Sequence, residues 1–160
     1  MRIRDFREAD SSRVNEVALS AFAQFKLLYD DWPAMAAGIG SMAALAQKGE
    51  VSVAEHDGTI IGAVAYIAPH APKAPYFDAA WPIIRMLVVD PQSRGLGAGR
   101  ALTEACIDRA RRDGSQVIAL HTSPIMTVAL PMYLRMGFAK LHDAPPIHGV
   151  EYAVYLKQLA

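Results

Sequence analysis

The sequence predicts a single α+β domain over residues 1–160, with helices packed on a mixed β-sheet. Two nearly continuous apolar runs, residues 82–90 and 116–123, have too few polar residues to face water on one side, so both belong at the sheet centre. Asp57-Gly58 joins two β-rich runs and is a strong hairpin signal. Strand-like and helix-like patterns follow the order β-α-α-β-β-β-α-β-α-β-β.

The elements before the first central strand follow from their periodicity. Asp10 or Ser11 caps the first helix, and Pro33 interrupts the second helical region. The expected elements are a strand over residues 1–6, a helix over 8–22, a broken helical region over 30–49, the hairpin over 50–68 and a proline-rich loop over 69–81.

After that strand, a glycine-rich segment leads into a helix. The expected elements are a helix over residues 97–114, the second central strand, a helix over 124–136 and strands over 138–143 and 150–159. Pro131 lies inside the later helix, where a proline removes a backbone donor, so we expect it to kink the helix and reposition Tyr133.

Charge and composition exclude several classes of protein. Sixteen basic residues balance sixteen acidic ones, which disfavours a nucleic-acid or anionic-membrane partner. No run approaches the ~20 apolar residues of a membrane helix, and the first ten residues lack a signal core. The single cysteine, Cys106, has no second cysteine in the sequence to form an internal disulfide with, which fits a cytoplasmic location. Its place in the apolar spacing of a helix predicts a buried hydrophobic residue rather than a nucleophile. No metal site is expected.

The segment from Gln92 to Arg100 contains three glycines at alternate positions between a strand and a helix. Such a turn can bind phosphate, because amides of the first helical turn point outward and the helix dipole adds positive charge. Its spacing matches neither the nucleoside-triphosphate loop nor the dinucleotide fingerprint. The alternative is a turn that only lets strand and helix pack closely. The residues alone therefore predict an anion or pyrophosphate site, and a turn with a purely structural role is the alternative.

Three segments together resemble the GNAT superfamily of N-acetyltransferases. Gln92-Ser-Arg-Gly95-Leu-Gly97 is similar to its Q/R-x-x-G-x-G/A signature, and residues 129–138 resemble its A-x-x-x-Y-x-x-x-G-F ending. Residues 3–22 resemble its opening strand and helix. The resemblance implies an α/β/α sandwich with a mixed, mostly antiparallel sheet of about seven strands, splayed between the fourth and fifth and flanked by about four helices.

The resemblance also implies acetyl-CoA as co-substrate. The pyrophosphate would be held by main-chain amides of the turn, and the pantetheine arm would pair with the preceding strand. The matching positions are Arg94, Gly95, Leu96, Gly97, Ala98, Gly99 and Arg100 in the turn, and Leu87, Val88 and Val89 in the strand.

The implied reaction is direct attack of an amine on the thioester. The Leu87 amide matches the family's carbonyl-polarising donor, and Tyr133 matches its acid for the CoA thiolate. A core role with the hydroxyl at the rim is the alternative for Tyr133. Many family members carry a glutamate as general base on the strand before the glycine turn, but this strand has only Arg85 there. His121 is a candidate base for the amine proton, and a purely structural histidine is the alternative. Asp78 is a weaker candidate for the same role.

The acceptor is less constrained. An aromatic stripe and a facing group in the long loop can form its wall or simply be core: Phe22, Phe25, Tyr29 and Trp32, then Tyr76, Phe77 and Trp81. We expect a small-molecule or peptide amine rather than a polycation. A non-catalytic CoA-binding sensor and an unrelated anion-binding domain are the competing functions. The edge strands are compatible with a homodimer.

Overall fold

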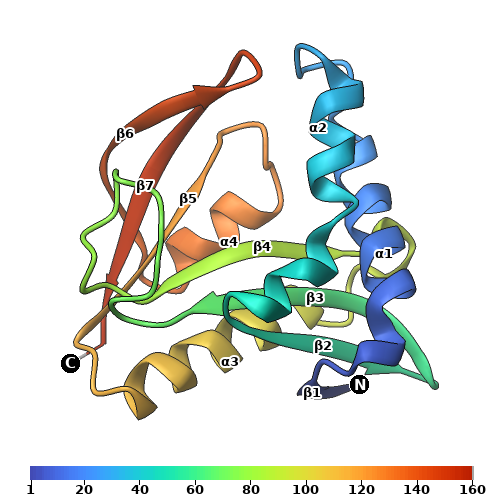
Figure 1. Cartoon of the computed structure of the whole chain (residues 1–160), viewed down its shortest axis with the longest axis horizontal. Coiled ribbons are helices and arrows are strands. Elements are labelled where there is room, and N and C mark those ends of the chain that lie inside the picture. The colour runs from blue at the N-terminus through green and yellow to red at the C-terminus, as the bar shows by residue number, and fades with distance from the viewer. Residues whose placement is uncertain (160) are drawn as a thin grey trace.

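Seven strands form one sheet in the computed structural model, which describes residues 1–159 (Figure 1). Their order across the sheet is β1-β2-β3-β4-β5-β7-β6, and every neighbouring pair is antiparallel except β4 with β5. The strands are β1 (Arg2–Asp5), β2 (Glu50–His56), β3 (Thr59–Ile67), β4 (Ile83–Val89), β5 (Val117–Thr122), β6 (Ala139–Ile147) and β7 (Val150–Gln158). The expected mixed, mostly antiparallel sheet is confirmed.

Helices cover both faces of this sheet. The helical elements are α1 (Ser11–Ala23), α2 (Trp32–Ile39), α3 (Ala98–Arg112) and α4 (Ala129–Arg135), with short 3₁₀ turns η1 (Glu8–Asp10), η2 (Met42–Gln47) and η3 (Pro91–Ser93). Buried side chains of α3, such as Leu102 and Cys106, pack in one core cluster with Tyr133 of α4. Val14 and Val17 of α1 pack with η2 against the opposite face. The α/β/α sandwich is therefore confirmed (Figure 1).

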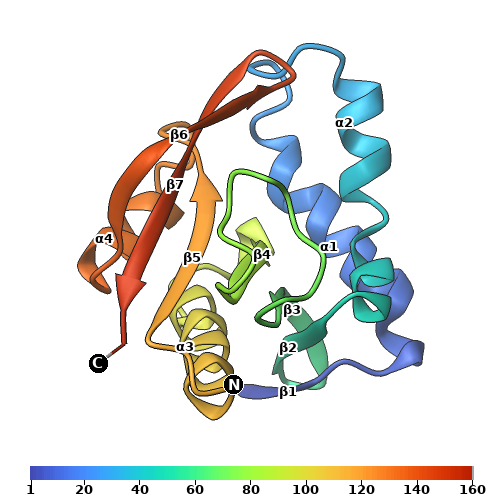
Figure 2. The same ribbon diagram turned by 60° about the vertical axis from the view of Figure 1, so that its left-hand side comes forward.

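The sheet opens at its centre. Strands β4 and β5 share a single register pair, Ile83 with Ala119, and the two halves of the sheet then diverge (Figure 2). Along its other edge β4 stays paired with β3, but Met86 and Leu87 together lie opposite Val64. Met86 has φ 60°, so this bulge puts a non-glycine residue in the left-handed region inside a strand. The splay implied by the resemblance is thus present, and a bulge accompanies it.

The chain differs from the sequence-based expectation around Pro131. Helix α4 begins only at Ala129, after turns, so Pro131 is its third residue. A proline in the first turn removes no intrahelical bond, because the first amides have no partner in the helix. The expected helix over residues 124–136 is therefore too long, and the expected kink is wrong.

The last strands form a longer hairpin than expected. Strand β6 runs on through Pro145 and Pro146 at the sheet edge, where a missing donor costs no ladder bond. Its turn to β7 uses His148 and Gly149, both with positive φ.

Within residues 1–159, no helix combines the length and apolar character needed to cross a bilayer.

Candidate active site

The glycine turn presents open backbone to solvent. Gly95 and Gly97 have φ of 86° and 79°, and a Cβ added to either would meet no atom within 4 Å. Gly97 precedes the first residue of α3, and its carbonyl accepts the first helical bond, from the Ala101 amide at 3.0 Å. In the described chain, the Ala98, Gly99 and Arg100 amides have no hydrogen-bond partner. The turn therefore offers the free donors and the space that a phosphate needs.

Side chains fix the start of this turn. The Gln92 amide donates to Asp90 Oδ1 at 3.0 Å, and the Arg13 guanidinium of α1 reaches Asp90 Oδ2 at 3.2 Å. The two arginines of the turn are held by neighbours: Arg94 donates to Gln24 Oε1 at 2.8 Å. Arg100 forms an exposed pair with Glu104 at 3.0 Å.

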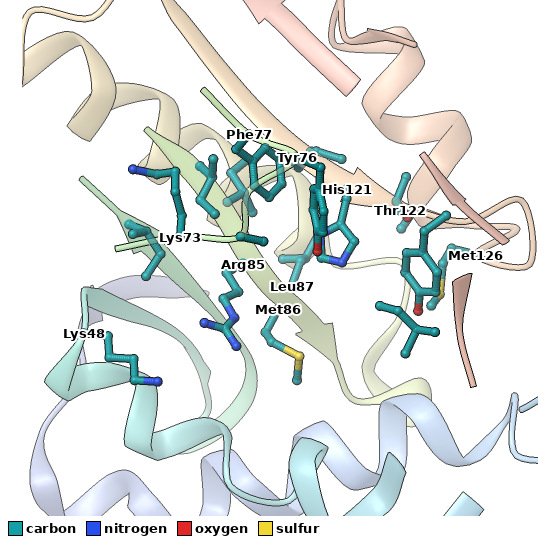
Figure 3. Close-up of a pocket in the computed structure, with 18 of the residues that line it drawn as sticks. Lys48, Lys73, Tyr76, Phe77, Arg85, Met86, Leu87, His121, Thr122 and Met126 are labelled. Carbon is teal, nitrogen blue, oxygen red and sulfur yellow. The ribbon is translucent and has the colours of Figure 1, made fainter. Parts of the chain in front are cut away.

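A cavity of about 790 Å³ occupies the gap between β4 and β5 (Figure 3). It is lined from both sheet faces. Leu87, Ala129 and Tyr133 belong to the α3 side, whereas Phe22 and Met35 belong to the α1 and α2 side. An opening through the sheet lets two molecules meet from opposite sides.

Leu87 lies at the β4 bulge and lines this cavity. Beyond Ile83, the β4 backbone has a strand partner only on its β3 side, so the edge that carries Leu87, Val88 and Val89 has no partner strand in β5. That edge is available to an extended ligand that pairs through its amides.

Tyr133 is buried between α4 and the core, with its ring 5.6 Å from that of Phe138. Tyr133 lines the cavity, and its hydroxyl makes no hydrogen bond to a described protein group. Burial raises the pKa of Tyr133, and the nearby Cys106 adds to the rise. The phenol therefore stays protonated at neutral pH, and the same raised pKa makes it a weaker acid than an exposed tyrosine. Cys106 itself is buried with its pKa raised by burial to about 12, which agrees with a core role.

His121 lines the cavity from β5 inside a group of aromatic rings. Its ring centroid lies 5.1 Å from that of Tyr152, 5.4 Å from Tyr76 and 5.9 Å from Phe77. Burial lowers the pKa of His121 to about 4, and Arg85 contributes to the decrease. At neutral pH the imidazole is therefore uncharged, but it is a weaker base than its unperturbed pKa suggested.

The predicted aromatic wall is only partly assembled at the cavity. Phe22, Tyr76 and Phe77 line it, as does Tyr152, which sequence reasoning missed because it is one of several alternating residues in a strand. The remaining members do not line it: Tyr29 is buried in a neighbouring core cluster, and Phe25, Trp32 and Trp81 are partly buried against that cluster. Asp78 is exposed and accepts from the Ala80 amide at 2.8 Å, so it closes a local turn instead of lining the cavity.

Three cationic side chains and no acidic one lie among the described residues that line the cavity: Lys48, Lys73 and Arg85. Lys73 is used internally, because its ammonium donates to three loop carbonyls, the nearest at 2.8 Å. Burial lowers the pKa of Lys73. Elsewhere in residues 1–159, no three His, Cys, Asp or Glu side chains gather where they could hold a metal ion.

The model of a family described as "Acetyltransferase (GNAT) family" matches residues 14–138. A mycothiol acetyltransferase of Cellulomonas flavigena is 36% identical over 101 residues, which make up 59% of this chain and 29% of that protein. The chain thus spans less than a third of the length of this curated relative.

Solved structures share the whole fold. An acetyltransferase of Corynebacterium glutamicum, described as histone acetyltransferase HPA2 and related acetyltransferase, superposes with a TM-score of 0.76 at 23% identity, covering 99% of this chain and 96% of that one. YncA of Salmonella typhimurium, described as a putative acetyltransferase with its cofactor acetyl-CoA, superposes with a TM-score of 0.71 at 21% identity. The match covers 100% of this chain and 94% of that chain.

Proposed function

The chain belongs to the GNAT family of acetyltransferases, and we propose on this basis that it transfers an acetyl group from acetyl-CoA to a primary amine of a small molecule or protein. The observation that carries the proposal is the order of features along one stretch of chain: Leu87 in the cavity, then the unpaired β4 edge, then the open glycine turn, with Tyr133 lining the same cavity as Leu87. Acetyl-CoA fits this arrangement: the open backbone at Gly95 and Gly97 suits a pyrophosphate, and the β4 edge suits the amides of the pantetheine arm.

The proposed reaction is one displacement at the thioester carbonyl. The amine nitrogen forms a bond to the carbonyl carbon, and the carbonyl oxygen becomes an oxyanion stabilised by the Leu87 amide. The intermediate then collapses, the carbon–sulfur bond breaks, and Tyr133 gives its proton to the departing thiolate. The proton that the amine loses returns to Tyr133 through solvent, so the enzyme is restored. The products are an N-acetylated amine and CoA.

Removal of the amine proton is the less defined step. His121 lines the cavity and is neutral, so we keep it as the proposed acceptor of that proton. Its lowered pKa makes it a weak base, and an amine that arrives uncharged would need less help from it.

The decisive experiment is a thiol-release screen with acetyl-CoA across amines, amino acids, antibiotics and peptides. Saturable release of CoA with one or more acceptors is the expected result. A Kd for acetyl-CoA measured by calorimetry accompanies the screen. Tight acetyl-CoA binding without thiol release from any acceptor would refute the enzymatic proposal.

One observation favours a second function, a CoA-binding sensor of the same fold. No carboxylate lines the described cavity, and the only histidine there is a weak base. A sensor would bind acetyl-CoA and CoA with different affinities and release no thiol, so the same two measurements separate it from an enzyme.

A cytoplasmic location is also proposed, supported by the single, reduced Cys106. A homodimer stays a prediction, which sedimentation of the purified protein would test.

A further inference from the structure

Arg85 is a solvent-exposed cation on the central strand β4. It lies on β4, two residues before Leu87, and its guanidinium forms no hydrogen bond or ion pair with any described residue. The other arginines near the site, Arg13 and Arg94, are both held by neighbours. A central-strand arginine that lines a cavity without a partner can bind an anion there.

The side chain of Arg85 lies on the acceptor side of the opening. Ile84 packs in the cluster with α3, so by strand alternation Arg85 faces the opposite side, where Phe22 and Met35 line the cavity. Figure 3 shows Lys48, Lys73 and Arg85 on one side of the pocket and Thr122 and Met126 on the other. The donor's phosphates have their own site at the glycine turn.

The charge of this side of the cavity selects among amines. Among the described residues, Arg85 and Lys48 form no ion pair, Lys73 is committed to loop carbonyls and no carboxylate lines the cavity, so a polycationic acceptor would meet repulsion from these charges. The field of Arg85 reaches the cavity wall, since it lowers the pKa of His121 and opposes the rise at Tyr76. The wall itself is aromatic, which suits an apolar side chain.

We propose that the acceptor is a small-molecule amine with an apolar portion and an anionic group close to the nitrogen, and that Arg85 binds this anion. This inference rests on the proposed acetyltransferase function and narrows its substrate class. A guanidinium fork matches a carboxylate or a phosphate in two parallel hydrogen bonds. The nearest simple example is an apolar α-amino acid. Arg85 acts here as a specificity-determining residue, and Lys48 adds charge.

The test compares matched acceptors by thiol release. L-phenylalanine is set against L-phenylalaninamide, and phosphoethanolamine against ethanolamine, which separates a carboxylate from a phosphate source. In each pair the member without the anionic group has the less basic amine, so a larger share of it is unprotonated at neutral pH. A preference for the anionic member is therefore not explained by amine protonation and points to binding. We expect kcat/KM to favour an anionic member at least tenfold.

Arg85→Gln should lower kcat/KM for the anionic acceptor about 10- to 100-fold, the effect of one charge-assisted pair, and change that for its neutral partner less than threefold. Arg85→Glu should reverse the preference. Arg2→Gln, on the far edge strand, is the control with the same chemical change and should leave both values unaltered. Circular dichroism and the acetyl-CoA Kd establish that each variant is folded.

The possible results distinguish a failure of this inference from a failure of the proposed acetyltransferase function. Thiol release that shows no preference for either anion, or a preference that survives Arg85→Gln, overturns the inference and leaves the acetyltransferase intact. An equal loss of acetyl-CoA affinity in Arg85→Gln also overturns it, because the arginine would then serve the donor. Absence of thiol release with every amine overturns both.

Discussion

Removing the hydroxyl of Tyr133 tests the proposed acid directly. Tyr133 lines the cavity and its hydroxyl has no partner among the described protein groups, so Tyr133→Phe leaves no buried donor or acceptor unpaired. We therefore expect the free energy of unfolding and the acetyl-CoA Kd to change little. General acid catalysis contributes roughly 100-fold or more to a rate, so kcat should fall by about that factor, or about 2.7 kcal/mol of activation free energy.

The measurement is steady-state thiol release, with calorimetry for the Kd and urea unfolding for stability. Tyr155→Phe is the matched control, because Tyr155 is buried in the same core cluster but does not line the cavity. Since burial raises the pKa of Tyr133, the wild type should show no alkaline decline from this group below about pH 10. A kcat within threefold of wild type, or equal losses in kcat and acetyl-CoA affinity, would refute the acid role.

Three further predictions concern the turn, the histidine and the thiol. Gly97→Val forces a β-branched residue to φ near 79° and should abolish acetyl-CoA binding by calorimetry, whereas Gly58→Val, at φ 75° in a hairpin, should cost similar stability but keep binding. The folded pKa of His121 is about 4 against 6.5 unfolded, so stability should fall as pH drops from 6.5 toward 4, by up to about 3 kcal/mol, and His121→Asn should flatten this dependence in urea titrations. Cys106, with a pKa of about 12, should react with a thiol reagent only after unfolding; labelling of the native protein would contradict this burial.

Local signals in the sequence predicted much of the fold. The Asp57-Gly58 turn has the positive φ values that its hairpin type requires, and the glycine turn stands between strand and helix as expected. Both depend on residues adjacent in the chain, which is why their composition is informative. The position of Pro131 within α4 does not follow from the sequence, because the start of this helix depends on packing that no cap residue marks.

The parts of the site that sequence could not predict depend on distant segments. The bulge at Met86 arises from pairing with β3, and nothing in residues 82–90 signals a positive φ. The low pKa of His121 requires Tyr76 and Tyr152, from a loop and the last strand, to enclose it. That Arg85 has no side-chain partner among residues 1–159 is likewise a property of the whole cavity lining.

The gap between β4 and β5 also bears on how a turnover proceeds. Because residues from both faces of the sheet line it, a donor on one side and an acceptor on the other can occupy the cavity at the same time. A direct transfer inside this gap requires both to be bound together. Initial-rate lines at several fixed acceptor concentrations would then intersect instead of running parallel, since no acetylated protein residue forms along the way.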